Sequence, residues 1–372
     1  MCKFTIPLPF HICVDDVGWF CGRDDRAIGG PSRTAMPRYH VPEDYEVLQM
    51  LGDEVGMNIS CAFILGEWDM ENRLSSIPNL SHFEGNWKNS IYRDKKEMER
   101  IVDIINSSPK LDMALHGLYH GYYAKGVDNP DLSDYYYTVN GRLHMTAEDE
   151  IRQRFDSFFD IMEYHNIKKS INHFIPPSFA FAQGGFTHIL KEYGISYVST
   201  IFSHLTWETG SEKNAFVENG VAVVDRNNNQ IPWDSVGFDA STLEPCRGIL
   251  GLHWPNLLHL SPADNRDSVK RIAEYVKRCL EEFSVAVSED ISLCATQYLY
   301  EKYTDVKQNE MSVELDISKV PRSECVKSFF FVNTKTPIVK IDGAHFTRHK
   351  KLKSHITYKV VPQQNNIRIS LS

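Results

Sequence analysis

The stretch FHICVDDVGWF, residues 10–20, has the pattern of a buried strand that ends in two adjacent carboxylates. Apolar residues at alternate positions lead directly to Asp15 and Asp16. Two neighbouring carboxylates repel each other unless a cation, a proton or bulk water relieves the repulsion. The rest of the sequence has to supply the partner of these two aspartates.

Six more runs of this apolar kind follow along the chain, at 59–65, 111–115, 170–175, 195–202, 221–224 and 248–252. Helical patterns lie between several of them, at 42–57, 93–106, 146–165, 184–193 and 265–283. At the start of 146–165, Thr146 and Asp149 have the spacing of a capping box. The runs are nearly continuously apolar, as parallel strands covered on both faces are. This alternation predicts an α/β fold, a distorted (β/α) barrel of seven strands. A barrel is favoured over a doubly wound sheet because polar residues follow many of the strands.

From residue 305 the composition changes to short β-branched and aromatic runs separated by turn residues. No helical pattern lies between these runs, which is typical of a small antiparallel β-domain. The sequence therefore predicts two domains, a barrel over 1–304 and a β-sandwich-like accessory domain over 305–372.

The composition is that of an ordinary soluble protein, with 42% apolar and 24% charged residues in 372. The net charge is −9 and the basic residues are scattered, so no nucleic-acid partner is expected. The short basic run at 349–353 fits a solvated strand edge. The eight cysteines are dispersed without a CxxC pair, and no apolar run is long enough to span a membrane. Strand-like sequence begins close to the first residue, so we expect a cytoplasmic protein without a membrane partner.

Histidines follow two further strands of the predicted barrel. His116 and His120 stand four residues apart in HGLYH, a spacing at which both imidazoles can reach one metal ion. His253 follows the last strand in LHWPN. Two histidines and one carboxylate form a common metal triad. Each feature alone is weak, because an Asp-Asp pair often caps a turn. Their joint placement at strand ends predicts a metal site in which a cation relieves the repulsion between Asp15 and Asp16.

The order of these segments resembles that of a divergent polysaccharide deacetylase, a carbohydrate esterase of the glycoside hydrolase and deacetylase barrel superfamily. The first motif of that family is a strand ending in Asp-Asp-Gly, and VDDVG has Val17 inserted before the glycine. The second is His-Ser/Thr-x-x-His, and HGLYH keeps both histidines with Gly117 in place of the hydroxyl residue. The fifth is Leu-x-His, and in ILGLHW the histidine stands one residue later than this spacing.

Two motifs of the family depart further. The third is similar to Arg-x-Pro-Tyr, and FIPPSF has the prolines without the arginine that orients the base. Arg23, Arg26 and Arg226 are the candidates to replace this arginine from elsewhere in the chain. The fourth motif, an Asp near a Trp that tunes the catalytic histidine, has an echo in Trp233-Asp234.

The resemblance implies a metal-dependent hydrolase that removes an N- or O-acetyl group from a sugar, or cleaves a related C–N amide bond. It implies Asp15 as general base, His253 as general acid, and Asp16, His116 and His120 as metal ligands. The expected cofactor is a divalent metal ion, with zinc as first choice and nickel, cobalt or iron as alternatives. The expected partner is a small carbohydrate or sugar-derived substrate.

Several residues near the strand ends are candidates for contacts with a sugar. The candidate substrate-binding residues are Glu67, Trp68, Asp69, Tyr119, Pro177 and Trp254. Aromatic faces suit sugar rings, although the same side chains can pack loops onto a barrel. The long polar-aromatic segment 121–145 can serve as a lid, as a surface loop or as a contact in a homo-oligomer.

Two other functions remain open. A glycosidase would need two carboxylates flanking the scissile bond, for which Asp15 with Glu67 or Asp69 are the candidates. A non-catalytic carbohydrate-binding protein on the same barrel would use the β-domain for its contacts. Bound metal favours an enzyme over the binding protein.

Overall fold

The computed structural model describes residues 4–20, 35–80, 94–202, 214–227, 229–283, 285–351 and 354–372. Its centre is an eight-stranded sheet in the order β11–β2–β3–β4–β7–β8–β10–β9. The strands of this sheet are β2 (His11–Val17), β3 (Ile59–Ile64), β4 (Leu111–Gly117), β7 (His173–Phe174), β8 (Tyr197–Thr200), β9 (Ala215–Glu218), β10 (Val221–Asp225) and β11 (Ile249–His253). All neighbouring pairs are parallel except β9 with β10, which is antiparallel.

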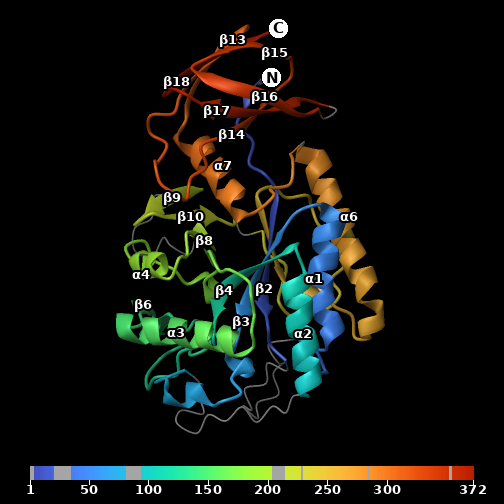
Figure 1. Cartoon of the computed structure of the whole chain (residues 1–372), viewed down its shortest axis with the longest axis vertical. Helices are drawn as coiled ribbons and strands as arrows, with labels where there is room; N and C mark the ends of the chain where they lie inside the picture. Colours follow the sequence, from blue (N-terminus) through green and yellow to red (C-terminus); the bar gives the residue numbers. More distant parts are fainter. Residues whose placement is uncertain are drawn as a thin grey trace.

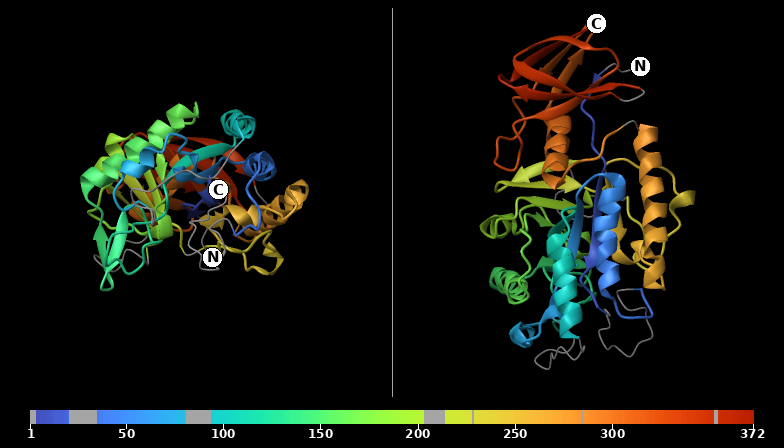
Figure 2. Two further views of the ribbon diagram at one scale, coloured as in Figure 1. Left: turned by 90° about the horizontal axis from the view of Figure 1, so that it is seen from below. Right: turned by 45° about the vertical axis from the view of Figure 1, so that its right-hand side comes forward.

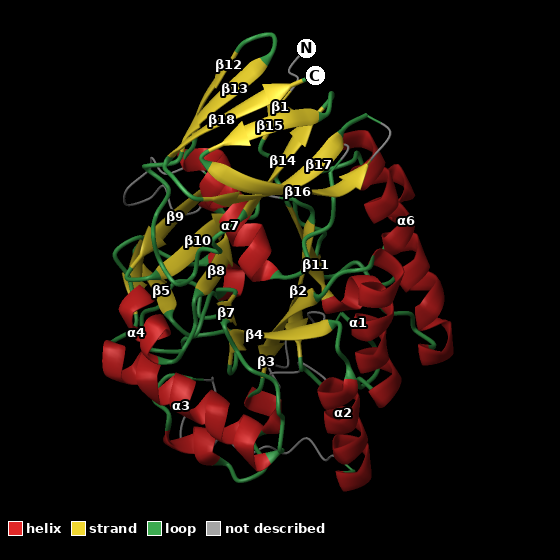
Figure 3. Cartoon of the chain, turned by 45° about the horizontal axis from the view of Figure 1, so that its top comes forward, coloured by secondary structure: helices red, strands yellow, loops and turns green. Residues whose placement is uncertain are grey.

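The sheet curls into a partial barrel (Figures 1 and 3). Its strands follow one another in chain order, and the last parallel strand, β11, returns beside the first, β2. On its other side β11 meets the segment that follows β10, because the N–H of Ile231 donates to the carbonyl of Gly251 at 3.0 Å. This contact brings the two ends of the curled sheet together. The predicted distorted barrel is confirmed, and its seven predicted strands are the seven parallel ones.

Helices cover the outer face of the barrel (Figure 1). They are α1 (Pro42–Val55), α2 (Lys95–Ser107), α3 (Glu148–Tyr164), α4 (Thr187–Glu192) and α6 (Asn265–Phe283). Each matches a predicted helical pattern, and each buries an apolar stripe in the largest core cluster. The predicted capping box at α3 is wrong. The hydroxyl of Thr146 donates to the carbonyl of Asp134 at 3.3 Å, and no side chain caps the helix.

One helix, α7 (Ile291–Tyr303), lies on the inner face of the barrel and was not predicted. Successive strand residues face opposite sides of a sheet. Accordingly, Ile12 and Val14 belong to the outer core, whereas Cys13 belongs to a separate cluster that contains five buried residues of α7. Thus α7 packs into the barrel at the end where the strands begin (Figure 3). The segment 121–145 ends in a hairpin of β5 (Tyr136–Val139) and β6 (Arg142–Met145).

The C-terminal part forms two four-stranded antiparallel sheets around one core cluster. The strands of the first sheet are β1 (Phe4–Thr5), β14 (Phe330–Thr334), β17 (Ile356–Pro362) and β16 (Ala344–Lys351). Those of the second are β12 (Asp305–Gln308), β13 (Ser312–Asp316), β18 (Asn366–Leu371) and β15 (Ile338–Asp342). The N-terminal strand β1 belongs to this part, and Tyr300 of α7 stacks on Phe330 with ring centroids 4.2 Å apart. The division at residues 304 and 305 stays a prediction.

These β-sheets lie at the end of the barrel where β2 begins (Figures 1 and 2). Asp15 and Asp16 lie near the other end of β2. The C-terminal sheets and the candidate site are therefore at opposite ends of the barrel. In the described part of the chain, no helix is both long and apolar enough to cross a membrane.

Candidate metal centre

The C-terminal end of β2 is irregular at the two aspartates. Its register with β3 shifts between Val14 and Val17, and Asp16 has a φ of 62°. This left-handed conformation is unfavourable for a residue with a Cβ, and such strain is common at functional sites. Asp15 meanwhile stays in register with His253 of β11. The irregularity thus places two consecutive carboxylates at the same end of the barrel in different surroundings.

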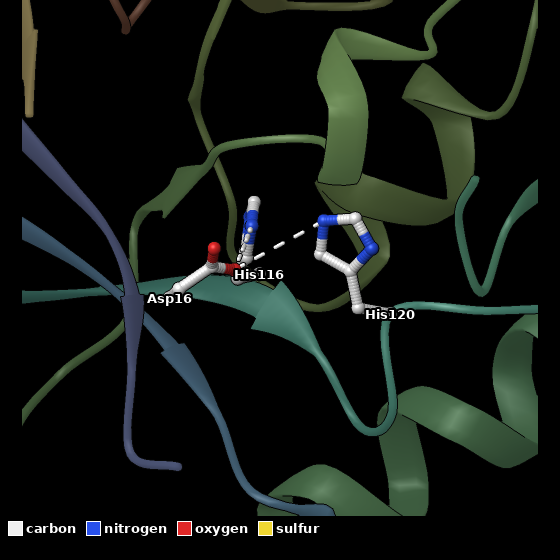
Figure 4. Close-up of side chains that lie close together, drawn as sticks. All are labelled: Asp16, His116 and His120. Carbon is white, nitrogen blue, oxygen red and sulfur yellow. Dashed lines mark ion pairs between the residues drawn. The ribbon is translucent and has the colours of Figure 1, made fainter. Parts of the chain in front are cut away.

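Asp16, His116 and His120 come together as the sequence predicts (Figure 4). One potential ligand atom from each residue lies within 4.8 Å of the other two. The Oδ1 atom of Asp16 is 3.5 Å from Nε2 of His116 and 4.0 Å from Nε2 of His120. His116 lies within β4, and His120 lies in the turn that follows this strand.

Hydrogen bonds orient both imidazoles toward Asp16. Nδ1 of His116 lies 2.5 Å from the carbonyl oxygen of Ile175, and Nδ1 of His120 lies 3.1 Å from that of Asp131. A carbonyl can only accept, so each Nδ1 carries a proton, and in the neutral imidazole each Nε2 keeps its lone pair. This is the arrangement in which histidine binds a metal through Nε2. Asp16 Oδ1 is buried and has no hydrogen-bond partner in the described chain, so the residues fit a divalent cation.

The electrostatics of the group follow from burial and proximity. Burial alone would raise the pKa of Asp16, but the imidazoles of His116, His120 and His253 hold it well below its ordinary value. Burial favours the neutral form of His116, whereas the carboxylates of Asp16 and Asp15 raise its pKa. Asp16 is therefore ionised, and positive charge is favoured beside it.

Asp134 explains why glycine replaces the hydroxyl residue in HGLYH. Its two carboxylate oxygens accept hydrogen bonds from the backbone N–H groups of Tyr119 and His120, both at 2.9 Å. A Cβ on Gly117 would lie 2.1 Å from Asp134 Oδ2. The buried carboxylate thus occupies the space of a side chain at position 117 and fixes the turn that carries His120. The sequence analysis missed Asp134, because no spacing pattern links it to the histidines.

Arg226 reaches Asp15 from the end of β10. Its Nη1 donates to Asp15 Oδ2 at 2.9 Å and to Oδ1 at 3.1 Å, and both side chains are buried. Its Nη2 donates to Gln230 Oε1 at 3.0 Å, and its guanidinium lies 4.9 Å from the ring centre of Phe179. A Cβ on Gly251 would overlap both Arg226 and Gln230, so β11 needs glycine there.

Arg226 is one of the three arginines predicted to replace the arginine that is absent from the third motif. It reaches the carboxylate from a different strand than FIPPSF. The other two candidates, Arg23 and Arg26, lie outside the described residues.

His253 is half-buried at the end of β11. Its Nδ1 donates to the carbonyl of Ile231 at 2.9 Å, which leaves Nε2 as the atom that can exchange a proton. The predicted echo of the fourth motif is wrong, because Trp233 and Asp234 are exposed and a backbone carbonyl holds Nδ1.

Glu67, Trp68 and Asp69 are buried and hydrogen-bonded to backbone groups. Glu67 accepts a short hydrogen bond from a backbone N–H, and Trp68 donates through Nε1 to the carbonyl of Gly18 at 2.8 Å. Asp69 accepts from the N–H of Leu74 at 2.9 Å. The contacts of Glu67 and Trp68 join the loop after β3 to the chain after β2, and that of Asp69 lies within the loop, so all three residues have structural partners.

The other candidate substrate residues are also buried. Trp254 has no exposed surface, stacks on His40 at 3.9 Å and donates to the carbonyl of Asp44. Tyr119 is buried edge-on against Trp19, with ring centroids 5.5 Å apart. Pro177 is buried in the turn after β7. The structure places these side chains in the packing around the site, and a contact with substrate stays a prediction for each.

Comparison with known proteins yields matches among solved structures alone. A scan against protein-family models gives no match, and neither does a search of curated proteins. A structure from Mycobacterium smegmatis, described as a polysaccharide deacetylase, has 13% identity and a TM-score of 0.41, covering 81% of this chain and 95% of its own. A mutant of a CE4 family pseudoenzyme with restored activity has 12% identity and a TM-score of 0.34, with coverages of 76% and 65%. A GH57-type branching enzyme from Pyrococcus horikoshii has 11% identity and a TM-score of 0.40, with coverages of 76% and 69%. The chain is thus similar to a structure described as a polysaccharide deacetylase, the family that its motifs resemble.

Proposed function

We propose that the chain is a metal-dependent hydrolase of the deacetylase type. It would remove an N- or O-acetyl group from a sugar-derived substrate, or cleave a related C–N amide bond. The observation that carries the proposal is the buried Oδ1 atom of Asp16, which has no hydrogen-bond partner among the described residues and lies near the Nε2 atoms of His116 and His120.

Asp16, His116 and His120 would hold one divalent ion, with zinc as the first choice and nickel, cobalt or iron as alternatives. Such an ion supplies Lewis-acid polarisation of the acyl carbonyl and acidifies water. Three protein ligands leave coordination positions open, as catalytic metal sites do.

Asp15 and His253 would handle the protons of the reaction. Asp15 would accept the proton of the attacking water, with its carboxylate held in one orientation by Arg226. His253 would donate from Nε2 to the leaving amine or alcohol, because Ile231 fixes its other nitrogen. Arg226 is a positioning residue in this scheme, since it touches the base and not the substrate.

The contacts of the described residues favour this function over the two alternatives. A glycosidase would need Glu67 or Asp69 beside the scissile bond, yet both are 1% exposed and bind backbone N–H groups. A binding protein that uses its β-sheets would contact sugar at the end of the barrel away from the histidines.

Metal analysis of the purified protein tests the proposal. Wild type, prepared without added metal or chelator, is expected to hold about one metal ion per chain by mass spectrometry. Asp16→Ala, His116→Ala and His120→Ala are each expected to lose it. His188→Ala is the matched control, because His188 lies on α4 with an exposed side chain. No metal in wild type after incubation with excess zinc would refute the metal site.

Turnover tests the assigned base separately. Asp15→Asn is expected to keep the metal and to lose acetate release on a panel of N- and O-acetylated sugars. Full activity of this variant on a substrate that wild type hydrolyses would show that Asp15 is not the base.

A further inference from the structure

Two cysteines meet on the outer side of the barrel, away from the metal centre. Cys246 lies in the segment that leads into β11, and Cys279 lies near the end of α6. The backbone N–H of Cys246 donates to Sγ of Cys279 at 3.3 Å, across 33 positions of sequence. The two thiols are also close enough to affect each other's pKa.

The backbone ahead of Cys246 is already docked on α6. Arg278 Nη2 donates to the carbonyl of Ala240 at 2.7 Å, and the hydroxyl of Tyr275 donates to the carbonyl of Glu244 at 3.0 Å. These contacts hold the segment that carries Cys246 against α6, so the two cysteines stay neighbours in the folded chain.

The surroundings also make this pair reactive. The neighbouring thiol of Cys246, its backbone N–H and the nearby Arg278 lower the pKa of Cys279. Burial instead raises the pKa of the other described thiols outside the pair, those of Cys13, Cys61, Cys294 and Cys325. A thiolate is the reactive form of cysteine. Cys246 is half-buried, so a small reagent in solution can reach the pair.

We propose that Cys246 and Cys279 are a redox modification site that forms a reversible disulfide with a small disulfide, such as oxidised glutathione, as oxidant. Cys279 takes up the proton of Cys246 as Cys246 attacks one glutathione sulfur, and the first glutathione leaves as a thiolate. Cys279 then attacks the Cys246 sulfur of this mixed disulfide, and the second glutathione leaves. The proton of Cys246 ends on one released glutathione, solvent protonates the other, and the two electrons from the cysteines reduce the oxidant's S–S bond.

The link would fasten the segment before β11 to α6. It would restrict the unfolded chain by closing a loop between positions 33 apart. Oxidation is therefore expected to raise the melting temperature of the protein, and reduction to restore the original value.

Peptide mass spectrometry tests the proposal on the whole protein. The folded chain is equilibrated in glutathione buffers from fully reduced to fully oxidised, blocked with iodoacetamide and digested. Wild type is expected to give a Cys246–Cys279 linked peptide in the oxidised buffers, and Cys279→Ser to accumulate glutathione on Cys246. Cys325→Ser is the matched control. It is expected to keep the link, because Cys325 is not part of the pair and its thiol hydrogen-bonds to Ser323.

Absence of the linked peptide from folded wild type in the fully oxidised buffer would overturn the proposal. So would glutathione that accumulates on Cys246 in wild type to the level seen in Cys279→Ser. A melting temperature that rises equally on oxidation in wild type and in Cys246→Ser would also contradict it. None of these readouts depends on bound metal or on hydrolysis, so they stand apart from the proposed function.

Discussion

Replacing Arg226 by methionine tests the buried pair that holds Asp15. The guanidinium and the carboxylate are 0% and 2% exposed and make two hydrogen bonds of 2.9 and 3.1 Å. Removing one partner of such a pair leaves the other charge buried without compensation, which costs roughly 3–5 kcal/mol. We expect the free energy of unfolding of Arg226→Met to fall by about this amount. The measurement is urea unfolding at pH 7 with chelator, followed by tryptophan fluorescence.

A double-mutant cycle separates the lost charge pair from lost packing. Adding Asp15→Asn to Arg226→Met removes the stranded charge, so the double variant is expected to recover at least about 1 kcal/mol. Arg100→Met is the control, because Arg100 and Glu43 are as close, at 2.8 Å, but exposed. This control is expected to behave as wild type. Strictly additive effects of the two changes at the buried pair would refute the reasoning.

Three further expectations follow from the described contacts. Gly117→Ser places a Cβ against Asp134 and is expected to cost about 1–3 kcal/mol and to weaken zinc binding, measured by thermal melts and zinc titration; an unchanged melting temperature would contradict this. Burial lowers the pKa of His11 to about 4, against about 6.5 unfolded. Buried, neutral His11 therefore contributes to the free energy of unfolding above pH 6.5. This contribution, about 3 kcal/mol in all, is lost as the pH falls to 4. In His11→Asn the free energy of unfolding is expected to vary less with pH over this range. A pH dependence equal to that of wild type would contradict the role given to His11. A chain cut after residue 304 is expected to keep a folded barrel by near-UV circular dichroism but to melt earlier, because Tyr300 loses its stacking partner; a molten spectrum would show one cooperative core.

The barrel was predictable because its strands are apolar on both faces. In β3 all six residues are buried, so the sequence shows an unbroken apolar run. The outer helices were predictable because each buries one stripe and exposes another. By contrast, α7 is buried on most sides inside the barrel and lacks that stripe, so its periodicity gave no signal.

The site was predictable in part. His116 and His120 have a spacing at which both imidazoles can reach one metal ion, and they come together with Asp16. Asp134 and Arg226 act through contacts between segments that are distant in sequence, which no local pattern records. For the aromatic candidates the sequence could not distinguish a ring that faces solvent from one that fills space between loops.

The pairing of β1 with β14 sets an order on how the protein is made. Phe4 and Thr5 leave the ribosome over 300 residues ahead of their partners, Thr334 and Asn333. The first strand therefore waits, unpaired, while the whole barrel emerges. During that interval its apolar residues and open edge are available to other chains or to chaperones. The C-terminal sheets can therefore be completed only after the barrel has been translated, and β1 pairs at that late stage.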